Sequence, residues 1–346
     1  MKKLLKALGI LLLAVVACAV FFIAFLTLRE YRPADEEPLS GFQGPAPAQG
    51  ASLRILSWNI GYAGLDKSAD FFMDGGKSVR SADRSAVERN LTAMVDRISS
   101  LAPDFTLLQE VDSDSSRTYS IDQRESFTAP GGTYALNYSC DFVPFPLPPI
   151  GKVHSGLLTL SNYGVSSASR VALPCPFSWP VSAANLKRCL LIDRIPLEGT
   201  DKELVLINLH LEAYDNGEGK AAQTALLKER IEAEYAAGNY VIAGGDFNQS
   251  FPDAVAAYPV KNAELWTPGL LSDDDLSEGW HFAYDVSVPS CRLLNQPYDP
   301  ADPTTQYYVI DGFILSPNVT LQSVQTLDLA FEHSDHNPVL LQAVLD

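Results

Sequence analysis

Residues 204–207 are all apolar, and this short run constrains the fold of the chain more than any other feature of its sequence. The run reads Leu204, Val205, Leu206 and Ile207, which is typical of a buried strand. Successive side chains of a strand point to opposite faces of its sheet, so both faces need apolar cover here. We therefore expect a sheet with a further layer packed on each side.

Segments that resemble strands outnumber helical ones along the chain. Helical periodicity is clear at 84–101, where apolar residues from Val87 to Leu101 recur at intervals of 4 and 3 residues, and again at 220–237. Many strands with a few helices to cover them favour an α+β sandwich over a doubly wound sheet. No linker or repeat interrupts 52–346, which we take as one domain. Strands are expected at 53–58, 105–108, 156–160, 189–195, 203–211, 240–243, 309–315, 319–327 and 339–345.

The first 28 residues differ from the rest of the chain. Lys2, Lys3 and Lys6 precede a charge-free apolar run over 8–28. Roughly 20 apolar residues cross ~30 Å of hydrocarbon, whereas the apolar core of a cleaved signal peptide is only ~7–15 residues long. We therefore predict a retained transmembrane helix at 1–28, followed by a linker at 29–51 that is rich in proline and glycine.

The charges around this helix predict its orientation. The three lysines lie before it, and the acidic cluster of residues 35–37 lies soon after it. The positive-inside bias then gives a single-pass protein of the cell membrane, with a cytoplasmic N-terminus and an extracellular main domain. Four cysteines would lie in that oxidising compartment, where both disulfides and free buried thiols are open. They are Cys140, Cys175, Cys189 and Cys291.

Net charge limits the partners of the chain. The sequence carries 25 basic and 42 acidic residues, a formal charge of −17. This balance argues against nonspecific binding of a polyanion through a broad basic surface. It leaves a phosphate substrate open, because divalent cations can supply the local positive charge.

Segment 251–306 is poorly periodic and contains scattered prolines and an acidic run at 273–275. A stretch of this length without clear elements in a compact domain is usually functional or mobile. Our hypothesis is that it forms a rim that selects the substrate.

Polar side chains stand where several expected strands end. Each has an ordinary interpretation by itself: a turn for asparagine next to glycine, a solvated strand end for a carboxylate, a hydrogen-bonded core residue for histidine. Together, however, they form the inventory of an oxygen-ligated divalent-metal site with acid and base histidines. The residues are Asn59, Glu110, His210, Asp246, Asn248, Asp335 and His336.

Asp311 lies inside an otherwise apolar segment, at 309–315. A buried carboxylate without a partner is costly, so Asp311 should have one. A histidine is the natural partner for it.

The order of these residues resembles the endonuclease/exonuclease/phosphatase superfamily, which includes deoxyribonuclease I, the apurinic endonucleases, bacterial sphingomyelinases and inositol-polyphosphate 5-phosphatases. The resemblance covers 52–346, which it identifies as a catalytic domain. It implies a four-layered α/β sandwich, with two mixed sheets face to face and helices outside. The motifs that carry it are Trp58-Asn59, Gln109-Glu110, Asn208-Leu209-His210, Gly245-Asp246-Phe247-Asn248, Asp311 and Ser334-Asp335-His336.

The resemblance also implies a role for each matching residue. Glu110 would bind Mg²⁺ (or Mn²⁺), helped by Asn59 and Asp335, and Asp246 would orient or deprotonate the attacking water. Asn248, His336 and Arg188 would hold the substrate phosphate, and Asp311 would orient His336. His210 matches an acid or phosphate ligand.

One residue departs from the pattern of the apurinic endonucleases. They carry an additional acidic metal ligand two residues after the motif asparagine, where this chain has Gly61. This difference disfavours that branch of the superfamily.

Three functions remain open at this level. The first is a phosphodiesterase outside the membrane that acts on nucleic acid or on phospholipid headgroups, as a nuclease or as a phospholipase C or sphingomyelinase does. The second is a phosphomonoesterase for a small phosphorylated metabolite, and the third is a catalytically silent binding module. The expected partners are the phosphoester substrate and the membrane, and no protein partner is indicated. Specificity in such folds lies in the loops.

Overall fold

Strand β8 (Glu203–His210) contains the all-apolar run and lies at the centre of a seven-stranded sheet in the computed structural model of the chain. The structure describes residues 1–81 and 83–346. The even-numbered apolar residues of the run pack between this sheet and a second, six-stranded sheet. The odd-numbered ones pack beneath helix α3 (Glu218–Ala236), next to Leu227 and Ile231. The expected cover on both faces of this strand is confirmed.

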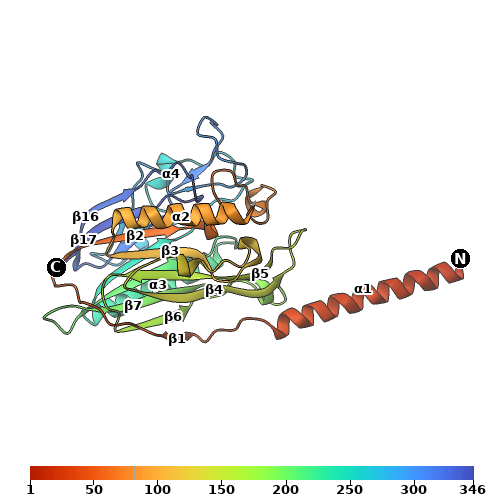
Figure 1. The fold of residues 1–346 in the computed structure, drawn as a ribbon, viewed down its shortest axis with the longest axis horizontal. Helices are drawn as coiled ribbons and strands as arrows, with labels where there is room; N and C mark the ends of the chain where they lie inside the picture. The colour runs from red at the N-terminus through yellow and green to blue at the C-terminus, as the bar shows by residue number, and fades with distance from the viewer. Residues whose placement is uncertain (82) are drawn as a thin grey trace.

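Both sheets are mixed, and they pack face to face as the inner layers of the domain (Figure 1). In order, the first sheet contains β1 (Glu36–Leu39), β6 (Ser167–Ala172), β7 (Cys189–Pro196), β8, β9 (Tyr240–Asp246), β15 (Asp311–Leu315) and β12 (His281–Ala283). The second contains β16 (Val319–Thr326), β17 (Val339–Leu345), β2 (Ser52–Asn59), β3 (Phe105–Asp112), β5 (Gly151–Ser161) and β4 (Gly131–Val143). Strands β8 and β9 pair in parallel, as do β2 and β3, and their other neighbours pair antiparallel.

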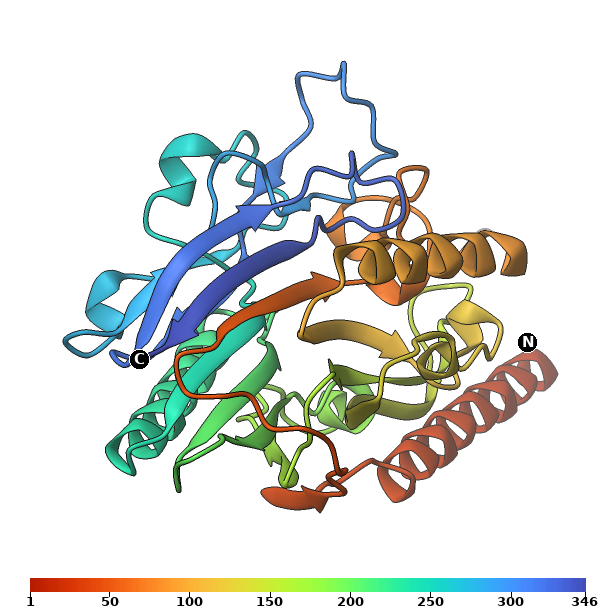
Figure 2. The same cartoon turned by 60° about the vertical axis from the view of Figure 1, so that its left-hand side comes forward.

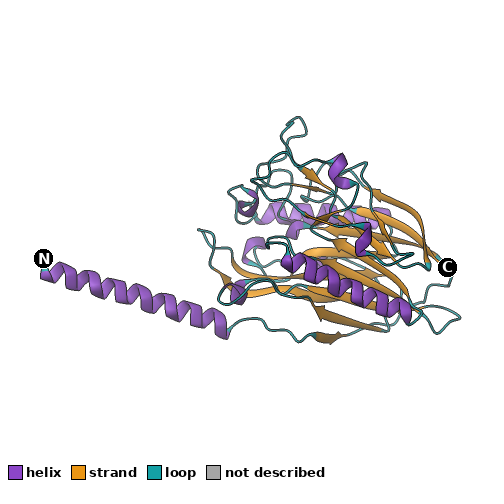
Figure 3. Ribbon diagram, turned by 180° about the vertical axis from the view of Figure 1, so that it is seen from behind, coloured by secondary structure: helices purple, strands orange, loops and turns teal. Residues whose placement is uncertain are grey.

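Helices form the outer layers of the sandwich (Figure 3). Helix α2 (Arg84–Leu101) crosses the outer face of the six-stranded sheet, where its Val87 and Leu91 pack with Trp58 (Figure 2). The helix begins after Asp83, whose side chain accepts a hydrogen bond from the backbone nitrogen of Ala86 at 2.7 Å. Helix α3 covers the other sheet in the same way. The predicted α+β sandwich of two mixed sheets with helices outside is confirmed.

Short elements make up much of the remaining chain, including segment 251–306. The short helix and strands are α4 (Ala254–Ala257), β10 (Gln249–Ser250), β11 (Gly269–Leu270), β13 (Cys291–Arg292) and β14 (Tyr307–Tyr308). Single 3-10 turns are η1 (Gly61–Ala63), η2 (Phe72–Asp74), η3 (Ser116–Thr118), η4 (Gln123–Ser126), η5 (Val181–Ala184) and η6 (Asp273–Asp275).

Helix α1 (Lys2–Leu28) projects away from the domain (Figure 1) and is long and apolar enough to cross a membrane. The proline- and glycine-rich segment at 29–51 follows it and includes a short strand. Strand β1 within it pairs antiparallel with β6, and Phe42 forms a bridge with Val165 further along. Backbone hydrogen bonds to a sheet edge therefore hold this proline-rich segment along the domain.

The sequence pattern does not predict strands β1, β4 and β6. Strands β1 and β4 lie at the edges of their sheets, where half-exposed positions dilute the apolar pattern that identifies a buried strand. Strand β15 begins at Asp311 rather than at residue 309, so this carboxylate lies at the end of a strand and not within it. The five cysteines are free thiols in the structure.

Candidate active site

The carboxyl ends of two parallel strand pairs meet at one end of the sandwich. In the six-stranded sheet, Asn59 at the end of β2 lies opposite Gln109 of β3. In the seven-stranded sheet, His210 at the end of β8 lies opposite Asp246 at the end of β9, and β15 places Asp311 beside Asp246. Strand direction and register thus bring together side chains that are far apart in the sequence.

Unusual backbone conformations aim several of these side chains. Glu110 has a φ of 56°, at an irregularity in the pairing of β3 with β5, and Asn248 has a φ of 51°. Gly245 has a φ of 150°, and a Cβ there would lie 2.0 Å from the carbonyl oxygen of Leu209. Such conformations cost about 1–3 kcal/mol each for residues other than glycine and are concentrated at functional sites. A bulge also re-aims a side chain at the end of a strand.

Asp246 is the hub of the site. Its Oδ2 accepts a hydrogen bond from Nδ2 of Asn59 at 3.0 Å, and its Oδ1 accepts one from the backbone nitrogen of Asn248 at 2.9 Å. Nε2 of His210 lies 3.4 Å from Oδ2, and Nε2 of His336 lies 3.8 Å from it. Burial raises the pKa of Asp246 to about 7, and the nearby carboxylate of Asp311 contributes to the rise. Asp246 is therefore placed to exchange a proton near neutral pH.

His336 is the partner of the buried carboxylate of Asp311. Its Nδ1 lies 2.8 Å from Oδ2 of Asp311, which also accepts a hydrogen bond from Oγ of Ser290 at 2.7 Å. Burial alone would lower the pKa of His336, but Asp311, then Cys291 and Asp335, raise it well above its ordinary value. His336 is consequently a buried cation at neutral pH.

His210 has the opposite electrostatic environment. Burial lowers the pKa of His210 well below its ordinary value, and the positive charge of Arg188 lowers it further. Its Nδ1 is buried and has no hydrogen-bond partner in the described part of the chain. The site therefore holds one neutral and one charged histidine on either side of Asp246, a division typical of acid and base roles.

Arg188 lies behind His210 and is only 4% exposed. Its Nε donates to Oε2 of Glu212 at 3.2 Å, and its Nη1 donates to the backbone carbonyl of His210 at 3.1 Å. Arg188 therefore forms a buried ion pair that supports the end of β8. Nearby, the side-chain amide of Asn248 donates to the carbonyl of Leu211 at 2.8 Å.

Two carboxylates and one carboxamide, those of Glu110, Asp335 and Asn59, are the oxygen donors that could hold a cation. Nδ2 of Asn59 lies 3.3 Å from Oε1 of Glu110 and also donates to Asp246. Burial raises the pKa of Asp335 to about 6, and the charge of Glu110 adds to this effect. Gly61 makes room for Asp335, since a Cβ at position 61 would stand 2.8 Å from its Oδ1. Carboxylates this close repel one another, and a hard divalent cation would relieve the repulsion, so the donor set fits one.

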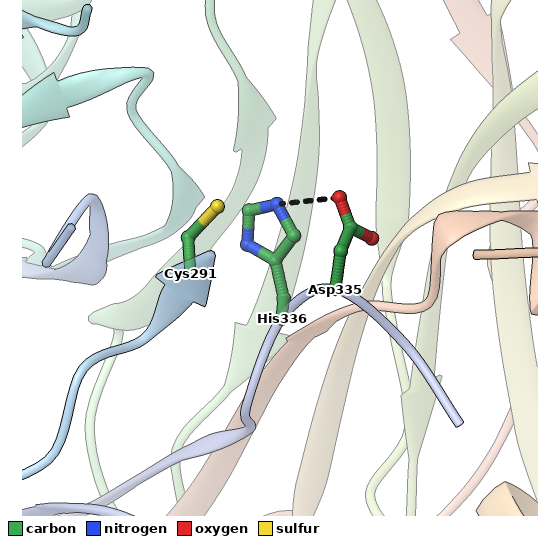
Figure 4. Close-up of side chains that lie close together, drawn as sticks. All are labelled: Cys291, Asp335 and His336. Carbon is green, nitrogen blue, oxygen red and sulfur yellow. Dashed lines mark ion pairs between the residues drawn. The ribbon is translucent and has the colours of Figure 1, made fainter. Parts of the chain in front are cut away.

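Two further groups of possible ligands share His336. The ligand atoms of Asp246, Asp311 and His336 lie within 4.8 Å of one another, as do those of Cys291, Asp335 and His336. Figure 4 shows the imidazole between the thiol and the carboxylate, with Nε2 of His336 3.9 Å from Oδ2 of Asp335. Burial raises the pKa of Cys291 to about 12, so it is a neutral thiol.

The sequence pattern misses three residues that support this site, Ser290, Cys291 and Glu212. The first two lie in the poorly periodic segment 251–306, where no strand end marks them. Ser290 holds Asp311, and the backbone of Cys291 forms a bridge with that of His336. Glu212 lies two residues after His210, and its charge next to an apolar strand is the only signal that could have found it.

The sequence matches the profile of the endonuclease/exonuclease/phosphatase family over residues 56–336. The chain belongs to this family. It is accordingly a phosphoester hydrolase with a divalent-metal-dependent site, as the acidic and histidine groups described above allow. The resemblance predicted from the motifs is confirmed. Among proteins of curated function, none matches this sequence.

Solved structures of the family share the fold at low sequence identity. An endonuclease/exonuclease/phosphatase from Beutenbergia cavernae is 17% identical, with a TM-score of 0.58 over 85% of this chain and 72% of its own. One from Bacteroides vulgatus is 18% identical, with a TM-score of 0.53 over 86% of this chain and 100% of its own. Truncated TDP2 from Caenorhabditis elegans is 17% identical, with a TM-score of 0.51 over 86% and 99%.

The family fold thus gathers the predicted site residues at one end of the sandwich. Arg188 is the exception in that it lies in the layer behind His210. The residues brought together are Asn59, Glu110, His210, Asp246, Asn248, Asp311, Asp335 and His336.

Proposed function

We propose that this protein hydrolyses a phosphodiester outside the cell membrane, with Mg²⁺ (or Mn²⁺) as the cofactor and α1 as a single-pass anchor. The observation that carries the proposal is the carboxylate of Asp246 between a neutral His210 and a charged His336. Such a set can activate water and stabilise charge on a phosphoryl group. The apolar length of α1 and the lysines before it support the anchor and its orientation.

Glu110, Asn59 and Asp335 would hold the cation. When bound, it supplies positive charge that offsets the charge on the phosphoryl oxygens. The family is metal-dependent, and the oxygen donors of these residues favour magnesium or manganese over softer metals.

The side chains of the chain itself can then perform the remaining work. Asp246, held by Asn59 and by the backbone of Asn248, accepts a proton from the attacking water. His336 donates from Nε2 to a phosphoryl oxygen, because its Nδ1 is already held by Asp311. His210 is neutral, so it would serve as a hydrogen-bonding group for an oxygen of the phosphate or of the leaving group rather than as a charged donor.

The charges of the site favour a diester over a monoester. A phosphodiester carries one negative charge, whereas a monoester carries nearly two at neutral pH. His336 is a buried cation that faces the reaction centre, while Arg188 is already neutralised by Glu212. A second negative charge would therefore lack a partner among the side chains described above.

Hydrolysis of soluble aryl phosphates by the full-length protein in nanodiscs tests the proposal. We expect a bis-aryl phosphate to be cleaved in the presence of Mg²⁺ or Mn²⁺ and EDTA to abolish the reaction. Asp246→Asn and His336→Gln should each lower turnover by at least ~10²-fold, because each removes a proton acceptor or a preorganised donor. Asp274→Asn, which changes an exposed carboxylate of η6, is the matched control.

Three results would overturn the proposal. They are turnover close to wild type in either site variant, activity that survives EDTA, and a preference for the monoaryl phosphate over the diester.

A further inference from the structure

Two loops of this acidic protein are uncharged and expose large apolar side chains. Residues 142–151 and 171–186 contain no charged residue, although the chain carries a net charge of −17. Phe145 is 66% exposed and Leu147 88% in the first loop, and Trp179 is 61% exposed and Val181 56% in the second. Exposed apolar residues that gather in this way mark an interaction surface.

Both loops lie at the end of the sandwich that holds the site. Strand β5 runs antiparallel to β3 with Ser155 opposite Asp112, so the β4–β5 turn extends beyond the end of β3 where Glu110 lies. Strand β7 runs antiparallel to β8 with Leu190 opposite Leu209, so the loop that leads into β7 lies beside His210. Register alone therefore places both loops on the catalytic side.

The end of helix α1 joins the domain at these same loops. Phe22 packs edge-on against Phe142, with ring centroids 5.9 Å apart, and Leu26 is buried against Cys140. Nε1 of Trp179 donates to Oγ1 of Thr27 at 3.0 Å. Figure 1 shows α1 leaving the domain on this side, opposite the C-terminus.

The charged residues nearest this junction are neutralised by ion pairs. Arg29 pairs with Asp141 at 2.6 Å, and Lys187 pairs with Glu30 at 2.9 Å. The acidic character of the chain therefore does not repel an anionic lipid surface at this junction.

Depth in the bilayer follows from the helix. If residues 8–28 cross the ~30 Å hydrocarbon layer, Thr27 lies at its outer boundary. Trp179, which is hydrogen-bonded to Thr27, then lies at the membrane interface, where tryptophan is favoured.

The apolar surface continues from these loops toward the site. The ring of Phe145 packs on that of Phe72 in η2, with centroids 5.8 Å apart, and the neighbouring Met73 is 42% exposed. Asp74, at the end of the same turn, accepts a hydrogen bond from the backbone nitrogen of Leu294. Two residues earlier, the backbone nitrogen of Arg292 donates to the carbonyl of Asp335. A chain of contacts therefore links the loop at 142–151 with the backbone beside Asp335.

We propose that the loops at 142–151 and 171–186 insert into the interface of the lipid bilayer and hold the site against it, so that the substrate is the phosphodiester of a lipid headgroup. The substrate class rests on the proposed function, whereas the membrane contact stands on the loops and the helix. Nucleic acid in solution would have to enter between the membrane and an acidic domain, which disfavours it.

Tryptophan quenching by brominated lipids tests the membrane contact directly. The full-length protein is placed in nanodiscs whose lipids carry bromine at shallow or deep acyl positions, and the spectrum of Trp179→Phe is subtracted. Trp58 and Trp280 are buried and Trp266 is half-buried, so the difference reports on Trp179. We expect quenching that is stronger for shallow bromines. If neither the shallow nor the deep brominated lipid quenches Trp179, the proposed membrane contact is wrong.

Kinetics with two substrates test whether this membrane contact promotes hydrolysis of a lipid. The double variant Phe145→Ser/Leu147→Ser should lower kcat/KM by about tenfold or more for a phosphodiester lipid within the nanodisc, because the inserted side chains lose their apolar environment. Its kcat/KM for the soluble bis-aryl phosphate should stay within about twofold of wild type. Val255→Ser, an exposed valine of α4, is the matched control and should change neither value.

The outcomes separate the two proposals. Equal losses on both substrates, no loss on the lipid, or a preference for DNA or RNA over the lipid would overturn the inference drawn here. If the wild-type protein hydrolyses no phosphodiester at all, the proposed function fails, and the quenching result still decides whether the loops contact the bilayer.

Discussion

Replacing Asp193 by asparagine should remove a large part of the pH dependence of stability in this protein. Asp193 lies in β7 and is fully buried between the two sheets. The hydroxyl of Thr133 donates to its two oxygens, at 2.8 and 3.0 Å. No basic side chain pairs with Asp193 among residues 1–81 and 83–346. Burial raises its pKa from 3.8 to about 7.

The magnitude follows from linkage. The rise of the pKa of Asp193 from 3.8 to about 7 corresponds to about 4 kcal/mol, and we take ~2–4 kcal/mol because water partly reaches buried groups. Ionised Asp193 destabilises the folded state at high pH, because the folded state binds the proton of this carboxyl more tightly than the unfolded chain does. Asp193 therefore contributes no penalty below about pH 4, a growing one up to about pH 7, and a constant one above that.

The measurement is the free energy of unfolding of the full-length protein in detergent, by denaturant titration between about pH 4 and pH 8. The difference between Asp193→Asn and wild type should change by ~2–4 kcal/mol in favour of the variant across this range, since other titrating groups cancel. Asp274→Asn, at an exposed carboxylate, should show no such change. A difference that stays constant with pH would refute the reasoning.

Three further predictions concern the site and its support. Asp311→Asn should lower kcat by ~10²–10⁴-fold with the fold retained by circular dichroism, because His336 loses the carboxylate that holds its ring and its charge; an unchanged kcat would contradict this role. Glu110→Gln should raise the Mg²⁺ concentration for half-maximal activity by at least ~10-fold, measured by metal titration, and an unchanged midpoint would remove Glu110 from the metal site. Asn208→Ala should lower the free energy of unfolding by about 2–3 kcal/mol, because it removes three buried hydrogen bonds, one from the amide of Gln109 and two to the carbonyls of Leu108 and Leu158; a loss below about 0.5 kcal/mol would show that the two sheets do not depend on this bridge.

The periodicity of the sequence was sufficient to predict the buried elements of the fold. The run at 204–207 requires cover on two faces, and helix α2 appears where its apolar stripe predicts it, at Arg84–Leu101. Strands β1 and β4 escape such prediction, because side chains at a sheet edge are partly exposed and need not be apolar. The pairing of β1 with β6 depends on backbone hydrogen bonds, which leave little trace in composition.

The candidate site likewise contains residues that the sequence predicts and residues that it does not. Residues such as Asp246 and His336 could be found from the sequence because a carboxylate or an imidazole at the end of an apolar strand is unusual enough to need a reason. Ser290 could not, because serine in a loop is ordinary and its contact with Asp311 arises from a segment that returns to the site.

Only the tertiary structure decided the charge states and the direction in which the site faces. His210 and His336 are the same residue type, yet burial beside Arg188 lowers the pKa of one while Asp311 raises that of the other. A pKa depends on solvent access and on charges within a few ångströms, neither of which sequence order specifies. In the same way, the sequence by itself identified an apolar helix and a set of candidate catalytic residues, but strand register and packing determined that both lie at the same end of the sandwich.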